Sequence, residues 1–170
     1  MMPKGSISAA LVVAFLTLPG CGLRPLYSGG GNSPVASMLR TVEVASIPGQ
    51  SGWLMRNKLI DRLGQAGVGA PAYRLDVKLD DNITAYGIRG DQAATRERRA
   101  LRARYQLVNL QTGLVLLDAT AGSDQGIDIV GSPYATVAAE QTALEELSDV
   151  VADQIVARLG LYASRTASGQ

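Results

Sequence analysis

Five arginines lie within nine residues of one another in a chain whose charges are otherwise almost balanced. They are Arg96, Arg98, Arg99, Arg102 and Arg104. A guanidinium group presents a rigid fork of donors that suits phosphate and carboxylate oxygens. The run therefore predicts an anion-binding patch, with Lys78 pointing beside it from a neighbouring strand. The alternative interpretation is a solvated edge whose cations form ion pairs with Asp76, Asp80 or Asp91.

Several common kinds of catalytic centre are excluded by the residues that the chain lacks, and only a site built from carboxylates stays conceivable. The chain has no histidine and one cysteine, which excludes Ser-His-Asp and Cys-His centres and any histidine-ligated metal. No pair of carboxylates stands out as a general acid and base. We therefore expect a protein that is not an enzyme and that uses no metal or other cofactor. The 16 basic and 15 acidic side chains also argue against a nucleic-acid partner.

The single cysteine, Cys21, follows a leader-like segment. Residues 1–4 carry one lysine, and an apolar stretch runs over 7–18. At about a dozen residues it fits the core of a signal peptide and falls short of the roughly 20 needed to span a bilayer. Leu18-Pro19-Gly20 then precedes Cys21 as a lipoprotein cleavage motif does, although proline replaces the usual Ala, Ser or Thr. We predict cleavage before Cys21 and acylation of its thiol; the alternative is an ordinary signal peptide with a buried cysteine.

Composition divides the rest of the chain into a tether and one folded body. The Gly/Ser-rich run that follows Cys21 is typical of a flexible linker. The sequence therefore predicts a signal peptide over 1–20, a lipidated N-terminus and tether over 21–38, a single domain over 39–162 and a frayed tail over 163–170.

Two hydrophobic periods alternate in the predicted domain. Period-two alternation predicts strands over 41–47, 73–85, 100–109 and 114–120, the last two joined by a turn at 110–113. Asp81 falls on the apolar face of its strand and favours a bulge or a strand end near it.

Apolar residues that recur every three or four positions predict two helices. One covers 52–64, and a longer one starts after the N-cap Ser132 and ends at Gly160. The apolar stripe of the longer helix consists of Leu144, Leu147, Val151, Ile155 and Leu159. The order β-α-β-β-β-α predicts an α+β two-layer sandwich, with one mixed four-stranded sheet and two helices on one face.

Several segments resemble one known family. The run Cys-Gly-Leu-Arg-Pro-Leu-Tyr27, the Arg-Glu-Arg-Arg99 run, the segment 132–140 and the segment 147–159 are similar to alphaproteobacterial members of the LptE family of lipopolysaccharide-assembly lipoproteins. The likeness covers essentially the whole chain after residue 20, and the expected order of elements agrees with the family's two-helix, four-stranded fold.

The resemblance implies a role and a location. It implies a lipoprotein of the outer membrane that plugs the β-barrel LptD, helps that barrel to assemble and contacts lipopolysaccharide on its way to the outer leaflet. Its expected partners are the barrel, lipopolysaccharide and, through the acylated Cys21, the membrane. Two rival classes stay open: an accessory lipoprotein of another envelope lipid transporter, and an anchored hydrolase.

Overall fold

A computed structural model of the chain describes residues 33–64, 70–88, 94–129 and 132–168. The predicted signal peptide, tether start and Cys21 lie outside these residues. The elements, in chain order, are α2 (Pro34–Arg40), β1 (Val42–Val44), α3 (Gly49–Leu63), β2 (Tyr73–Ile88), β3 (Ala94–Asn109), β4 (Val115–Asp128) and α4 (Pro133–Ser168). The fold is α+β, as the sequence predicts.

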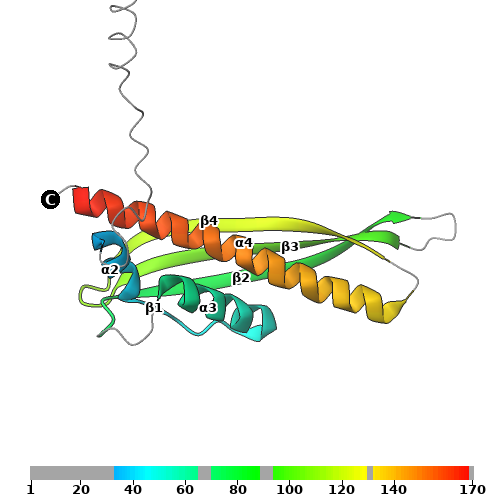
Figure 1. Cartoon of the computed structure of the whole chain (residues 1–170), viewed down its shortest axis with the longest axis horizontal. Coiled ribbons are helices and arrows are strands. Elements are labelled where there is room, and N and C mark those ends of the chain that lie inside the picture. Colours follow the sequence, from blue (N-terminus) through cyan, green and yellow to red (C-terminus); the bar gives the residue numbers. More distant parts are fainter. Residues whose placement is uncertain (1–32, 65–69, 89–93, 130–131, 169–170) are drawn as a thin grey trace, which may run out of the picture.

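The four strands form one mixed sheet in the order β1-β2-β3-β4. The short strand β1 pairs in parallel with the start of β2, with Val42 opposite Tyr73. The other pairings are antiparallel, and α3 makes the crossover between the two parallel strands. The helices α3 and α4 cover one face of the sheet and leave the other uncovered (Figure 1). We call the uncovered side the outer face.

The core lies between the sheet and α4. Alternate residues of β2 and β3 point to the helices, as the period-two pattern predicts. The buried side chains of this layer include Leu75, Val77, Leu101, Ala103, Tyr105 and Leu107. The predicted apolar stripe of α4 packs against them, and each of its five residues is buried. One cluster of side chains therefore holds both layers together.

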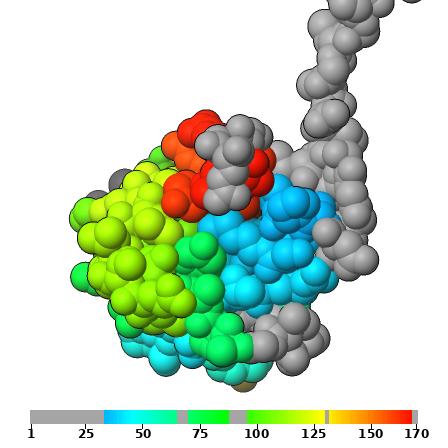
Figure 2. All heavy atoms as spheres, turned by 90° about the vertical axis from the view of Figure 1, so that its left-hand side faces the viewer, coloured from blue at the N-terminus to red at the C-terminus, as the bar shows by residue number. Residues whose placement is uncertain are grey.

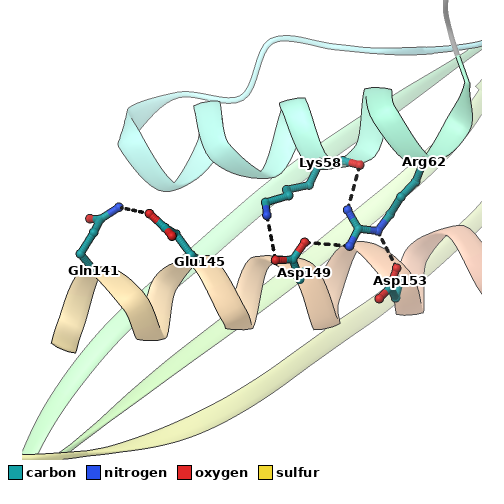
Figure 3. A network of polar contacts seen from close by, with 6 residues as sticks. All are labelled: Lys58, Arg62, Gln141, Glu145, Asp149 and Asp153. Carbon is teal, nitrogen blue, oxygen red and sulfur yellow. Dashed lines mark hydrogen bonds and ion pairs between the residues drawn. The ribbon is translucent and has the colours of Figure 1, made fainter. Parts of the chain in front are cut away.

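A row of charged contacts joins α3 to α4 along their exposed side (Figure 3). Lys58 Nζ lies 2.7 Å from one oxygen of Asp149, and Arg62 bridges Asp149 at 2.8 Å and Asp153 at 2.5 Å. The hydrogen bond from Lys58 and that from Arg62 lower the pKa of the Asp149 carboxyl. Because all four side chains are partly exposed, the row orients the two helices more than it stabilises them.

The structure corrects the predicted limits of two segments. Residues 34–38, predicted as part of the tether, belong with 39 and 40 to the helix α2, because Ser33 caps it and its buried residues Val35 and Leu39 join the core. The helix α4 continues through Gly160 to Ser168, so the frayed tail expected from residue 163 is wrong for 163–168. Gly160 and Ala163 are buried, and this burial offsets the low helix propensity of glycine.

The strands also differ in length from the prediction. Strand β1 is shorter than expected, while β2, β3 and β4 are longer, and residues 121–128 extend β4. No bulge forms at Asp81, because the pairing of β2 with β3 runs without a shift from Tyr73 to Tyr86. The predicted hairpin turn is confirmed, since Gly113 adopts a φ of 70° and its N–H donates to the Asn109 carbonyl at 2.8 Å.

Candidate functional site

Four of the five arginines lie on the outer face of the sheet. Arg96, Arg98, Arg102 and Arg104 occupy alternate positions of β3 and are exposed, whereas Leu101 between them points to the helices. Lys78 stands opposite Arg104 on β2, as the sequence predicts. We call Arg96, Arg98, Arg102, Arg104 and Lys78 the cation column. It lies on the face of the sheet that no helix covers, and Figure 1 shows the helices on the other face.

Three of these arginines have carboxylate partners on β4. Arg96 lies 2.6 Å from Asp128, Arg102 lies 2.6 Å from Asp124 and Arg104 lies 3.0 Å from Asp118. Both partners of each pair are at least a third exposed, so water screens the attraction and each pair contributes little to stability. The expected partners Asp76, Asp80 and Asp91 are not used here; Asp76 pairs with Arg74, and Asp91 lies outside the described residues. Such exposed pairs can open at little cost when another anion approaches.

Arg98 and Lys78 have no carboxylate partner among the described residues. Arg98 lies between Thr84 and Gly126 in the sheet register and shares a shallow hollow with Thr84 and Tyr86. Lys78 lines a second hollow with Arg102 and Arg104. These two cations can therefore bind an external anion without first releasing a carboxylate.

Glycines on β4 make room on the outer face. At Gly122 a Cβ atom would collide with Cδ of Arg102, so the arginine side chain lies directly over this residue. At Gly126 a Cβ atom would stand 3.6 Å from the hydroxyl of Tyr86, whose ring therefore reaches across β3. The small residues let long side chains lie flat on the sheet and keep the hollows open.

The fifth arginine, Arg99, lies on the opposite side of the sheet and does not join the column. Its guanidinium donates to both oxygens of Asp81, at 2.8 and 2.7 Å, and to the backbone carbonyl of Glu140 on α4 at 2.8 Å. The Arg99 and Asp81 side chains are only 12% and 19% exposed. Arg99 therefore ties β2, β3 and α4 together, which is a structural task.

Glu97 shares the helix side with Arg99. Burial, and then the nearby Glu140 carboxyl, raise the pKa of Glu97. One of its oxygens is buried without a hydrogen bond among the described residues. Glu97 and Arg99 alternate in phase with Leu101, so they lie on the helix side. The sequence would have predicted this position if the predicted strand had started before residue 100.

Gln154 of α4 is a further contact that the sequence did not reveal. Its side chain accepts from the Gly122 N–H at 3.1 Å and donates to the Gly122 carbonyl at 3.4 Å. Strand β4 is the edge of the sheet, so these backbone groups have no neighbouring strand. The side-chain amide of Gln154 makes the two hydrogen bonds to Gly122 that a residue of a neighbouring strand would otherwise make.

No group of three or more potential metal ligands gathers in the described ranges. Among the same residues, no helix has the length and apolar character needed to cross a bilayer. The described residues form a small α+β domain whose one uncovered sheet face carries arginines, a lysine and carboxylates. The chain belongs to the LptE family, whose description is lipopolysaccharide assembly and whose profile matches residues 39–159.

Solved structures share this fold. A putative lipoprotein from Caulobacter crescentus is similar with a TM-score of 0.65 and 24% identity, over 76% of this chain and 96% of that one. A minor lipoprotein from Acinetobacter baumannii has a TM-score of 0.58 and 16% identity, over 72% and 92% of the two chains. For rare lipoprotein B from Shewanella oneidensis the values are 0.52 and 10%, over 75% and 96%. A search of curated proteins found no match.

Proposed function

We propose that this protein is a lipoprotein of the outer membrane that plugs an LptD-type β-barrel, helps the barrel to assemble and assists the insertion of lipopolysaccharide into the outer leaflet. The observation that carries the proposal is the family match, which covers almost the entire folded domain. The protein itself performs no catalysis in this role. Its contribution is a rigid shape, a polar outer face and an acylated Cys21.

The dimensions of the body suit a lumen. Strands β2 and β3 have 16 residues each and α4 has 36, which correspond to lengths of about 50 Å. All of them run along the same long axis (Figure 1). The hydrocarbon layer is about 30 Å thick, so a body inserted lengthwise would extend across it inside a barrel.

The cation column supports a contact with lipopolysaccharide. The head group of this lipid carries phosphates and carboxylates, which guanidinium and ammonium groups bind through charge-assisted hydrogen bonds. Arg98 and Lys78 would bind first, because they have no carboxylate partner among the described residues. Arg96, Arg102 and Arg104 would follow by releasing their exposed carboxylates. Arg99 is held on the other side of the sheet and would not take part.

Pull-down of the tagged protein from its own outer membrane in mild detergent tests the proposal. Mass spectrometry should recover a large β-barrel at near-equal stoichiometry. Recovery of the subunits of another lipid transporter would favour the accessory-lipoprotein alternative, and recovery of neither would contradict the plug role.

A further inference from the structure

The turn between β3 and β4 exposes an apolar surface at one end of the molecule. The exposed fractions are 39% for Leu110, 62% for Leu114 and 51% for Val115. Residues 106–117 contain no charged side chain, in a chain of which 18% is charged. Exposed apolar side chains in a segment without charges suit a contact with another apolar phase.

The apolar residues are held in place and do not belong to a loose loop. The side-chain oxygen of Asn109 accepts from the N–H groups of Gln111 at 2.9 Å and Thr112 at 3.1 Å. The N–H of Leu110 donates to the Ala72 carbonyl at 3.0 Å, which fastens the turn to the start of β2. The turn therefore presents its leucines in a fixed direction, at no further cost in conformational entropy.

The described part of the chain begins at the same end of the molecule, with Ser33 and α2. Figure 2 looks onto this end and shows α2 and the β3–β4 segment on either side of the start of β2. The described body begins at Ser33, twelve residues after Cys21. Twelve residues span about 40 Å at most when fully extended, so an acyl anchor at Cys21 would keep this end within that distance of the bilayer.

A basic side chain lies at this end as well. Arg165 is exposed in the last turn of α4, and no carboxylate among the described residues pairs with it. An apolar tip with a nearby cation matches the chemistry of a membrane interface, where acyl chains meet phosphate groups. The tether also raises the effective concentration of lipid at the tip, so a weak contact suffices.

We propose that the β3–β4 turn rests in the interfacial region of the membrane that holds the lipid anchor, with Leu110, Leu114 and Val115 in contact with lipid. The proposal rests on the acylation of Cys21, which belongs to the proposed function. The contact is reversible and orients the long axis of the body away from the membrane plane.

Site-directed fluorescence of the lipidated, mature protein in phosphatidylcholine vesicles tests this placement. Trp53 is the only tryptophan and is exposed, so Trp53→Phe supplies a background without tryptophan. On that background, Leu114→Trp places a probe in the turn, and Val137→Trp places a matched probe at the opposite end, because Val137 is also 62% exposed. Val115→Trp serves as a second turn probe if the first variant does not fold, as judged by circular dichroism.

The turn probe should shift its emission to the blue and lose intensity when brominated lipid replaces ordinary lipid, whereas the probe at position 137 should show neither change. Equal responses at the two positions, or none at either, would overturn the inference. A mass that shows no acyl group on Cys21 would overturn it too, by removing the anchor. The pull-down is a separate measurement: a barrel recovered with Leu110→Ser/Leu114→Ser, but no quenching at the turn, would refute the membrane contact and leave the plug role intact.

Discussion

The two ends of the sheet are built differently. At the turn end, where β2 starts and β3 finishes, the helices α2, α3 and α4 and the strand β1 all join one apolar cluster. At the other end, which we call the open end, Ile83, Tyr86, Tyr134 and Val137 are exposed. There Arg99, which is half-buried, ties α4 to the sheet by pairing with Asp81 and donating to the Glu140 carbonyl. The difference shows that stability is concentrated at one end, while the cation column extends toward the other.

Core truncation at the turn end should have the largest effect. Leu107 is fully buried, so Leu107→Ala should lower the free energy of unfolding by about 2 to 5 kcal/mol. Ile83→Ala, at the partly exposed open end, is the matched control and should cost about 1 kcal/mol or less. Urea denaturation followed by circular dichroism measures both values. Equal losses would show that the open end shares the same core.

Arg99→Ala should have the next largest effect on stability. It leaves the carboxylate of Asp81 and the Glu140 carbonyl without their donors, so we expect a loss of about 1 to 3 kcal/mol. Arg102→Ala breaks an exposed pair and should cost about 0 to 1 kcal/mol in the same denaturation assay. A smaller loss for Arg99 than for Arg102 would contradict the structural role of Arg99.

Lipopolysaccharide binding should depend on cations of the outer face that stability does not require. Arg98→Ala and Lys78→Ala should each weaken binding of purified lipopolysaccharide by about three- to tenfold, because each removes a charge-assisted hydrogen bond. The free energy of unfolding should stay unchanged in both. Arg74→Ala is the control, since Arg74 is also exposed on the outer face but lies at the turn end and pairs with Asp76. Equal weakening by Arg74→Ala would mean that the contact depends on net charge alone.

The pH dependence of stability should differ between the charged row that joins α3 to α4 and the open end of the sheet. These effects should be the smallest of those predicted here. The pKa of Asp149 is lowered from 3.8, so its stabilising contribution is complete above that pH and is lost as the pH falls through the folded-state value. The pKa of Glu97 is raised from 4.5, so its ionised form destabilises the fold, and this penalty disappears as the pH falls toward 4.5.

Conservative amides test these two signs in thermal melts at several pH values. Glu97→Gln should raise the melting temperature at pH 7 and leave it unchanged near pH 4. Asp149→Asn should lower the melting temperature at pH 7 and flatten its decline below pH 4. Opposite signs at pH 7 would exclude the assigned environments of the two carboxyls.

The sequence predicted the elements whose signals are local. Alternation identified the strands, and the stripe from Leu144 to Leu159 identified α4. The helix α2 was missed because its seven residues follow a Gly/Ser-rich run and owe their order to burial of Val35 and Leu39 against distant elements. The extension of α4 past Gly160 has the same kind of cause. Tertiary packing determines where α2 forms and where α4 ends, and local helix propensity does not predict either limit.

The candidate site was predicted in composition but not in geometry. Period two alone predicts that Arg102 and Arg104 share one face of their strand and that Lys78 lies on the polar face of its own strand. The partners on β4, such as Asp124 and Asp118, depend on the register between two strands, which a single sequence does not give. Arg99 was grouped with the column because the predicted strand began after it, so its direction was undetermined.

In the role we propose, the contact between Gln154 and Gly122 affects how the domain behaves beside a β-barrel that is still folding. Strand β4 is a long edge, and a barrel that has not yet closed offers a free edge of its own. Two such edges could pair through backbone hydrogen bonds and form one sheet from both proteins. By occupying one backbone position of β4 with its amide, Gln154 makes the domain a poor template at that point. The protein can therefore lie beside the strands of a folding barrel without pairing with them at this position.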